Sequence, residues 1–389
     1  MTPRSAAFAL CLTPAWLLAA GTVRAATTDI LVGLDEKITY DANGQVNGAP
    51  GKDAVLVLDV ANPAHPRIRA TLPLMNSLLG PPTNLQITPD GKLGLVANSV
   101  VMNQEGAAWK VAPDNQLFVI DLTANPPKLA DTVTVGKQPS GMAISRKGDL
   151  VLIANRAGKS VSVLSIAGGT VKLVADVPLG QEAAAVAITP DGKRAFVCMN
   201  QVNKIAVLAI DGQTVSYDKA MDIPSALNPY NIEVTRDGKY VIASNTGASG
   251  LDADAEVVID ATGAHPHVID LVAPGNGPEG FAISPDGKWA AAPLLLGTGA
   301  PQSAHFFTKT GELALMSVGP HGKLTVTGRA KLGALPEGIA FSPKSDYLYV
   351  GNYIDRDLQV FHIEGGKLKQ VGPNIKLPGQ PASMRGPAS

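Results

Sequence analysis

A short apolar hairpin recurs along most of the chain, and this repeat restricts the possible folds more than any other feature. Residues 85–98 read as an apolar strand, a Thr-Pro-Asp-Gly-Lys turn and a second apolar strand that ends in Asn, and residues 186–200 repeat this order. Asp-Gly between two apolar runs is a strong hairpin signal, because glycine supplies the positive φ that the turn requires. Weaker copies of the turn follow at residues 145–149, 235–239, 284–288 and 342–346.

The spacing of these turns predicts a β-propeller. The second turn residue falls at positions 89, 146, 190, 236, 285 and 343, so the repeat recurs every 44 to 58 residues. A period of about 40 to 50 residues with four short strands per unit is typical of propeller blades. In the clearest unit we assign the four strands, a to d, to residues 131–135, 140–145, 150–155 and 160–166.

Six hairpins account for six blades, and the two ends of the chain supply a seventh. The C-terminal end offers residues 371–377 and 379–384 as strands a and b, whereas the N-terminal end offers Ile30–Leu34 as strand c and Ala54–Val60 as strand d. We therefore predict an all-β, seven-bladed propeller with four antiparallel strands per blade. Joining N-terminal strands c and d to C-terminal strands a and b closes the ring and leaves no open sheet edge.

The first 25 residues have the pattern of an export signal. Arg4 precedes an apolar run over residues 6–20, and Val23-Arg24-Ala25 has the small-x-small pattern of a cleavage site. The run is too short for a membrane anchor. We expect residues 1–25 to be removed near Ala25, so that residues 26–389 form one propeller domain in the periplasm or outside the cell, without membrane insertion.

Composition restricts the partners and the chemistry. Without the signal the chain has 30 basic and 33 acidic residues, which gives no basis for binding nucleic acid. One cysteine, Cys198, remains in an apolar strand, where we expect a buried structural thiol. The sequence lacks a Cys-x-x-Cys-His haem site, a nucleophile elbow, a Walker loop and a dinucleotide fingerprint. We expect a monomer that binds an unidentified protein or small molecule.

Long insertions are expected to lie on one face of the propeller. In the predicted lettering, the a–b and c–d loops share a face, and four c–d connections are long: residues 36–53, 99–114, 246–254 and 294–312. The other face carries short hairpins. Because loops on a rigid scaffold often carry function, we expect the site on the elaborated face.

The first residues of the predicted b strands lie near the channel mouth on that face. Aligned on the repeat, the seven positions are Thr83, Ser140, Ala184, Tyr230, Glu279, Glu337 and Ala382. Two neighbouring blades offer Pro-Glu-Gly, so we predict that the carboxylates of Glu279 and Glu337 face a shared region. Such a pair serves as a general base or as hard oxygen ligands for a cation. The alternative is a pair of solvated turn residues.

Further candidate ligand-binding residues surround this pair. Asn84 and Asn231 follow the first positions of their strands, and His305 lies in an insertion beside Phe306 and Phe307. Arg156 and Arg356, in c–d turns, have the charge needed to hold an anionic substrate. His265-Pro266-His267 has no third ligand nearby in sequence, so we predict no metal site and no cofactor there. A cation site at the channel mouth is an alternative that the sequence leaves open.

The repeat resembles the YVTN family of β-propellers, whose signature closes strand c. The corresponding residues here are Leu-Val-Ala-Asn at 95–98, Leu-Ile-Ala-Asn at 152–155 and Tyr-Val-Gly-Asn at 349–352. The chain is also similar to the wider group of lactonase-like seven-bladed propellers, which includes 6-phosphogluconolactonases and carboxymuconate cyclases. The resemblance covers nearly the whole chain after residue 25 and implies a periplasmic or cell-surface protein. No motif of the resemblance assigns catalytic residues to positions of this chain.

Three functions follow as hypotheses. The leading one is an exported binding or interaction module that uses the elaborated face. The first alternative is a lactonase-like hydrolase or isomerase of a small ester or lactone, in which Glu279 or Glu337 activates water. The second alternative is an electron-transfer partner subunit, because the heavy chains of amine dehydrogenases are also seven-bladed.

Overall fold

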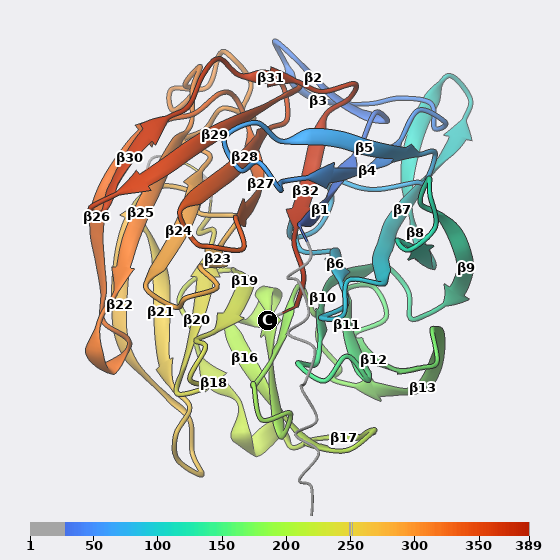
Figure 1. Ribbon diagram of the computed structural model, residues 1–389, viewed down its shortest axis with the longest axis vertical. Coiled ribbons are helices and arrows are strands. Elements are labelled where there is room, and N and C mark those ends of the chain that lie inside the picture. Colours follow the sequence, from blue (N-terminus) through green and yellow to red (C-terminus); the bar gives the residue numbers. More distant parts are fainter. Residues whose placement is uncertain (1–27, 249, 251, 389) are drawn as a thin grey trace, which may run out of the picture.

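A computed structural model describes residues 28–248, 250 and 252–388 as seven small antiparallel sheets around a central axis (Figure 1). The prediction of an all-β, seven-bladed propeller with four antiparallel strands per blade is confirmed. The export signal predicted for residues 1–25 lies outside the described residues. We number the blades 1 to 7 from the closing blade and letter their strands a to d from the channel outward.

Three blades hold the ends of the chain and the first hairpins. Blade 1 consists of β32 (Pro381–Arg385), β1 (Asp29–Leu34), β4 (Ala54–Asp59) and β5 (Arg67–Leu72). Blade 2 consists of β6 (Leu85–Ile87), β7 (Leu93–Glu105), β8 (Ala108–Asp121) and β9 (Lys128–Thr134). Blade 3 consists of β10 (Pro139–Ile144), β11 (Leu150–Asn155), β12 (Ser160–Ala167) and β13 (Thr170–Pro178).

The remaining blades follow in chain order. Blade 4 consists of β14 (Val186–Ile188), β15 (Arg194–Met199), β16 (Lys204–Asp211) and β17 (Thr214–Tyr217), with β18 (Ile223–Pro224) also paired to β16. Blade 5 consists of β19 (Pro229–Val234), β20 (Tyr240–Asn245), β21 (Asp254–Asp260) and β22 (His267–Gly275). Blade 6 consists of β23 (Ala282–Ile283), β24 (Trp289–Leu294), β25 (Glu312–Val318) and β26 (Leu324–Lys331). Blade 7 consists of β27 (Pro336–Phe341), β28 (Tyr347–Asn352), β29 (Asp357–Glu364) and β30 (Lys367–Gln370), with β31 (Ile375–Lys376) also paired to β29.

Smaller elements complete the described structure. The hairpin of β2 (Ile38–Asp41) and β3 (Gly44–Asn47) forms a separate two-stranded sheet. Three short 3₁₀ helices occur, η1 (Asn200–Val202), η2 (Lys219–Met221) and η3 (Pro320–Gly322). Among the described residues, no helix has the length and apolar character needed to cross a membrane.

The ends of the chain close the ring, but the predicted two-plus-two partition is wrong. The C-terminal end contributes one strand, β32, and the N-terminal end contributes three, β1, β4 and β5. Residues 371–377 do not form an innermost strand, because Val371 donates to the carbonyl of Val360 and β31 pairs with β29 of blade 7. Antiparallel pairing of β1 with both β32 and β4 still removes the open edge that an unpaired end would leave.

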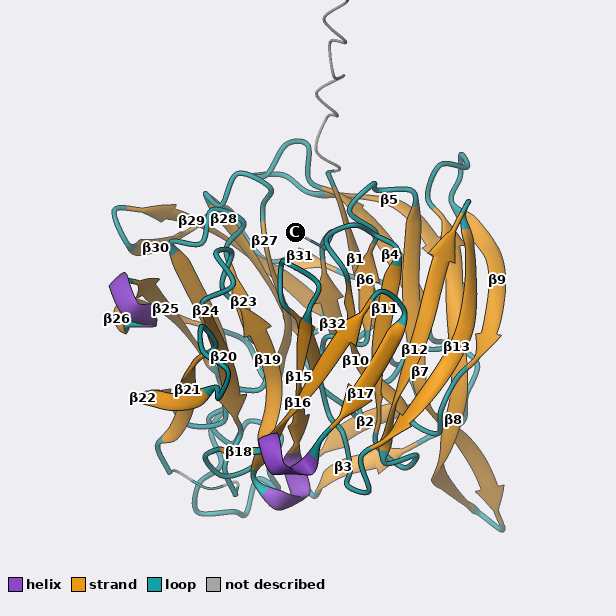
Figure 2. Ribbon diagram, turned by 90° about the horizontal axis from the view of Figure 1, so that it is seen from below, coloured by secondary structure: helices purple, strands orange, loops and turns teal. Residues whose placement is uncertain are grey.

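The strand letters also shift by one position. Residues 131–135, predicted as strand a of a blade, lie mainly in β9, which pairs with β8 as the outermost strand of the preceding blade. The Asp-Gly turns therefore join strands a and b, and the long insertions join strands b and c. The insertions and the first residues of the innermost strands still share one face, which we call the mouth face; Figure 2 shows the hairpin β2–β3 and the tip of β7–β8 there.

The repeated turn is held by its own side chains. In blade 2, the hydroxyl of Thr88 donates to Asp90 at 2.6 Å, the amide of Leu93 donates to Thr88 Oγ1 at 3.1 Å, and Gly91 adopts a φ of 68°. Thr189, Thr235 and Ser284 form the same bond to the Asp two residues later. Since these bonds are local, the hairpin follows from the sequence motif itself.

Apolar side chains pack between neighbouring blades and not within one central core. For example, Leu152 and Val163 of blade 3 pack with Val197 and Leu208 of blade 4. Cys198 belongs to the next cluster, between blades 4 and 5, where it is fully buried and burial raises the pKa of its thiol. The prediction of a buried structural thiol is confirmed.

Candidate functional site

The innermost strands approach one another closely at the channel mouth, which explains the Gly of Pro-Glu-Gly. A Cβ on Gly280 would lie 2.4 Å from the carbonyl oxygen of Glu337, and one on Gly338 would lie 2.5 Å from the amide nitrogen of Met384. On the far side of the ring, the amide of Gly141 donates to the carbonyl of Ala184 at 2.9 Å. Only glycine leaves room for the neighbouring strand here, so the preceding residue is fixed at the mouth.

Glu279 and Glu337 come from adjacent blades and interact electrostatically. Glu337 has a relative exposure of only 2%, and its Oε2 has no hydrogen-bond partner among the described residues. Burial raises the pKa of Glu337 well above its ordinary value, and the Glu279 carboxylate raises it further. Burial also raises the pKa of Glu279, to about 7, although the Arg156 guanidinium opposes this shift. The two side chains are therefore not the solvated turn residues of the alternative hypothesis.

Arg156 supplies the positive charge of the site. It follows β11 of blade 3, and its Nη1 donates to the hydroxyl of Tyr230, the second residue of β19 in blade 5, at 3.3 Å. The guanidinium also lies 5.6 Å from the centroid of the Tyr230 ring. Blade 4 has Ala184 at the corresponding position, and this small side chain leaves room for Arg156 to reach past it. The buried Nε of Arg156 has no partner in the described chain.

The hairpin β2–β3 forms a lid over the mouth. In its turn, the carbonyl of Ala42 accepts a hydrogen bond from the amide of Gln302, which lies in the insertion of blade 6. Asn47 of the hairpin donates to the carbonyl of Trp109 in the β7–β8 hairpin of blade 2. Tyr40 of the lid packs edge-to-face against Tyr353, with ring centroids 6.2 Å apart. Burial raises the pKa of Tyr40, and so do the nearby carboxylates of Glu337 and Glu279. The lid therefore brings a phenol to the glutamate pair.

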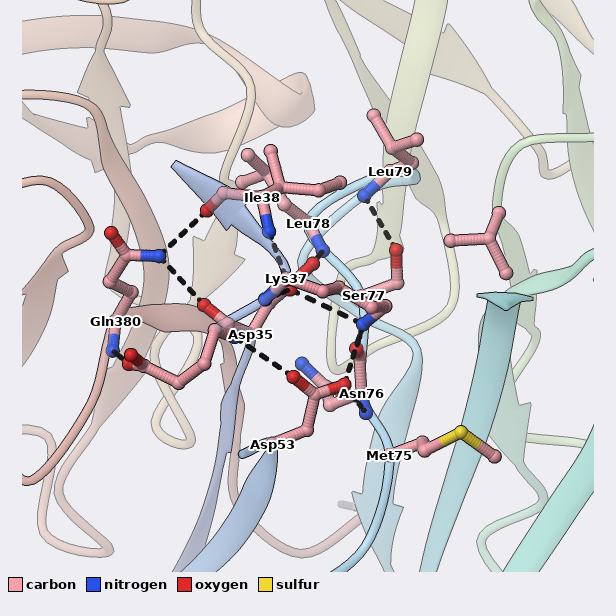
Figure 3. A network of polar contacts seen from close by, with 12 residues as sticks. Asp35, Lys37, Ile38, Asp53, Met75, Asn76, Ser77, Leu78, Leu79 and Gln380 are labelled. Carbon is pink, nitrogen blue, oxygen red and sulfur yellow. Dashed lines mark hydrogen bonds and ion pairs between the residues drawn. The ribbon is translucent and has the colours of Figure 1, made fainter. Parts of the chain in front are cut away.

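A buried ion network anchors the lid to the closing blade (Figure 3). Lys37 Nζ lies 2.6 Å from Asp53 Oδ2 and 3.2 Å from Asp35 Oδ1, and all three side chains are at most 2% exposed. Asp35 also accepts from the amide of Leu78 at 2.8 Å. Gln380 Nε2, just before β32, donates to the carbonyl of Ile38 at 2.7 Å. One network thus joins the start of the lid, the β5–β6 loop and the C-terminal strand.

A cavity of about 290 Å³ opens beside the lid. Its wall contains Tyr40 of β2, Ile354 of blade 7 and Phe307 and Lys309 of the blade 6 insertion. It therefore leads from solvent to Tyr40, the residue of the lid that faces the two glutamates.

The remaining predicted residues of the innermost strands are mostly structural. Asn84 donates to Asn76 Oδ1 and to the carbonyl of Ala97, both at 2.8 Å, and so orders the β5–β6 loop. Asn231 donates to the carbonyl of Phe281 at 3.3 Å and so joins blades 5 and 6. Ser140 is fully buried beneath Gly80 of the β5–β6 loop, and its hydroxyl has no partner in the described chain.

His305 and Arg356 do not join the glutamate pair. His305 is exposed and packs edge-to-face on its neighbour Phe306. Arg356 forms an ion pair with Glu36 at 2.9 Å and donates to the carbonyl of Pro378, so it binds the β1–β2 connection to the segment before β32. The described residues contain no group of three His, Cys, Asp or Glu side chains arranged to hold a metal ion.

Tyr40 and Glu182 are site residues that the sequence argument missed. Tyr40 lies in an insertion that was predicted to be on this face, but its sequence does not indicate which way the hairpin folds. The Glu182 carboxylate, with Tyr230, helps raise the pKa of Arg156. Glu182 stands two residues before Ala184, so the repeat alignment that selected the seven mouth positions passed over it.

The chain is similar to known lactonase propellers. A family model described as a seven-bladed β-propeller lactonase matches residues 105–231 and 173–253. No curated protein matches the chain in sequence. The predicted resemblance to lactonase-like seven-bladed propellers is confirmed.

Solved structures share the fold at low sequence identity. A putative 6-phosphogluconolactonase from Bacteroides fragilis is 18% identical, with a TM-score of 0.65 over 92% of this chain and 97% of that chain. A periplasmic gluconolactonase from Pseudomonas aeruginosa is also 18% identical, with a TM-score of 0.63 over 92% and 98% of the two chains. Hydrazine synthase from Kuenenia stuttgartiensis, at 18% identity and a TM-score of 0.60, covers 79% of this chain and 90% of that chain. At this identity the likeness is one of fold alone.

Proposed function

We propose that this lactonase-like seven-bladed propeller hydrolyses a small lactone or ester at the channel mouth, beneath the β2–β3 lid. The observation that carries the proposal is the pair of interacting glutamates beside one buried arginine. Burial raises the pKa of both carboxyl groups, and the Glu279 carboxylate raises that of Glu337 further, so the two groups titrate as a coupled pair. Such a pair can supply both a general base and a general acid.

The chemistry assigns a role to each group. Glu279, with a pKa of about 7, takes a proton from a water molecule that attacks the carbonyl carbon of the lactone. When the ring C–O bond breaks, protonated Glu337 donates its proton to the departing ring oxygen. Arg156 holds an anionic group of the substrate with its guanidinium and lowers the pKa of Glu279. A hydroxy acid leaves, and proton exchange with solvent restores the pair.

The setting of the site is also a proposal. An export signal over residues 1–25 would deliver the propeller to the periplasm, and the fold of a periplasmic gluconolactonase from Pseudomonas aeruginosa supports a substrate of this class. The cavity beside Tyr40 and Lys309 is where we expect the substrate to approach.

A panel of sugar lactones and aliphatic lactones tests the proposal. Rates are measured by release of acid for the wild type and for Glu279→Gln, Glu337→Gln and Arg156→Gln, with the exposed Glu364→Gln as a matched charge-removal control. We expect each Gln variant at the site to lose about 10²–10⁴-fold in kcat/KM, as removal of an acid–base group does. The control should keep the wild-type rate.

The same panel separates hydrolysis from the binding-module hypothesis. If a lactone or its hydroxy acid binds the wild type saturably, binds the Arg156→Gln variant more weakly and is not opened, the mouth is a binding site and the hydrolase proposal is wrong. Equal turnover in the wild type and all three site variants would remove the glutamate pair from the chemistry.

A further inference from the structure

The channel has a second cavity at the end opposite the mouth. It has a volume of about 330 Å³, within the usual range for small-molecule sites. Its walls are partly apolar, with Ile144, Ile283 and Phe341 from the innermost strands, and Ala388 of the C-terminal tail contributes as well. Figure 1 shows this tail at the centre of the ring. We call this cavity the turn-face funnel.

The rim of the funnel consists of one position of the repeated turn. All six second turn residues line it: Pro89, Arg146, Pro190, Arg236, Pro285 and Pro343. Four blades therefore present proline, whereas blades 3 and 5 present arginine. The turn does not require arginine, because the same Thr/Ser-anchored geometry forms around proline in the other blades.

The two rim arginines have no carboxylate partner among the described residues. Arg146 Nη2 donates to the carbonyl of Arg236 at 3.3 Å, and Arg236 Nη1 donates to the carbonyl of Pro285. Both bonds use backbone acceptors, so neither guanidinium is held in an ion pair within the described chain. Arg146 crosses the turn of blade 4 to reach blade 5, which places the two guanidiniums on the same side of the rim.

The other charges of the funnel are already paired. Arg385 at its base forms an ion pair with Glu233 at 2.6 Å, and Asp29 pairs with Arg69 at 2.5 Å. The Asp residues of the turns accept bonds from their own Thr or Ser, and Asp90, Asp237 and Asp286 also form ion pairs with the Lys of the same turn. The funnel therefore has an excess of positive charge at its rim, above a partly apolar wall.

A constriction separates the funnel from the glutamate site. A void of about 20 Å³, lined by Thr83, Asn231, Phe281 and Met384, lies along the channel between them. This space is about the size of one water molecule, so a ligand of several heavy atoms does not pass through the channel without movement of these side chains.

We propose that the turn-face funnel is a second binding site, for a small organic anion with an apolar body. The guanidiniums of Arg146 and Arg236 would bind the anionic group, because arginine matches carboxylate and phosphate oxygens with paired N–H donors. The apolar part would pack against Ile283 and Phe341. This site needs neither the glutamate pair nor the lid, so it is independent of the proposed hydrolysis.

Calorimetric titration with phenyl phosphate tests the proposal, with inorganic phosphate and benzyl alcohol as partial probes. The informative variant is Arg146→Pro/Arg236→Pro, which gives these two turns the proline of the other four. Neither amide is used in a backbone hydrogen bond of the turn. We expect phenyl phosphate to bind the wild type more tightly than either partial probe, and the double variant to bind it at least about tenfold more weakly.

Two controls make the result decisive. Arg146→Gln/Arg236→Gln removes the charges without altering the turn backbone, and it should lose binding to a similar extent if the proline variant folds poorly. Arg156→Gln, at the mouth, should retain wild-type binding. Loss of binding in Arg156→Gln with retention in both double variants would place the ligand at the mouth, and absence of saturable binding to the wild type would equally overturn the funnel site.

Discussion

At the scale of single residues, two buried glutamates show how surroundings separate a structural acid from a reactive one. Glu256 is fully buried, and burial raises its pKa to about 8. Ser244 Oγ lies 2.9 Å from Glu256 Oε1 and 3.0 Å from the carbonyl of Pro278. Ser244 Oγ donates to Glu256 Oε1 and opposes the rise in its pKa, so Glu256 has a structural partner. Glu256 Oε2 and Glu337 Oε2 both lack a hydrogen-bond partner in the described chain, but Glu337 also interacts with a second acid, Glu279, so its proton can serve a substrate.

The raised pKa values predict a bell-shaped dependence of kcat/KM on pH. Activity requires ionised Glu279, so the rate should rise with pH through about 7. It also requires protonated Glu337, so the rate should fall at higher pH, where that carboxyl group ionises. Arg156→Gln should move the rising limb to higher pH, because the guanidinium lowers the pKa of Glu279. A rising limb near pH 4.5 would mean that Glu279 is a solvated carboxylate.

At the scale of elements, the lid depends on ions that are buried far from water. Ile38 and Tyr40 of the hairpin β2–β3 pack in an apolar cluster. The network of Lys37 with Asp35 and Asp53 fixes the point at which the hairpin leaves β1. Burial raises the pKa of Asp35, and the Lys37 ammonium opposes this rise. The network therefore stabilises the lid only while all three charges are present.

Lys37→Met should destabilise the protein strongly, because it leaves two buried carboxyl groups without their cation. We expect a loss of about 3–5 kcal/mol in the free energy of unfolding, measured by urea denaturation. Lys92→Met is the control: its pair with Asp90 is exposed, and such pairs contribute about 0–1 kcal/mol. Equal losses in the two variants would show that the buried network does not anchor the lid.

At the scale of the whole molecule, closure rests on a single C-terminal strand. β32 pairs with β1. The tail after β32 contacts blade 2, where Ile87 donates to the carbonyl of Gly386 at 3.3 Å and accepts from the amide of Ala388 at 2.9 Å. Three strands of blade 1 come from the other end of the chain, so the ring is held by contacts between residues more than 300 positions apart. Such closure is cooperative, because blades 1, 2 and 7 lack complete packing partners until both ends are in place.

Removal of residues 379–389 should therefore abolish cooperative folding, since β1 becomes an open edge beside an empty innermost position. We expect aggregation on size-exclusion chromatography and no sharp thermal transition. Removal of residues 386–389 keeps β32 and should leave a soluble protein that melts cooperatively. A soluble, sharply melting form of the longer deletion would show that β32 is dispensable for closure.

Much of the fold follows from the sequence because its signals are local. A Thr-Pro-Asp-Gly-Lys turn forms its own hydrogen bonds within five residues, so the hairpins, the number of blades and the positions at the mouth could all be predicted. Pro-Glu-Gly also pointed to the glutamate pair, since Gly280 and Gly338 are required by the neighbouring strands. The boundary between blades is not local: β9 looks like any other strand of alternating pattern, and only its pairing with β8 assigns it to blade 2.

The sequence by itself determined the repeat, the all-β ring and the first residues of the innermost strands at the channel mouth. Tertiary structure alone decided that three N-terminal strands and one C-terminal strand close the ring, that Glu337 is buried and that the hairpin brings Tyr40 near it. It also placed Arg156 beside Tyr230 at the site, whereas Arg356 pairs with Glu36 in the β1–β2 connection. The physical reason is that charge and burial depend on distances across the ring. Those distances are set only when blades far apart in sequence close around one axis.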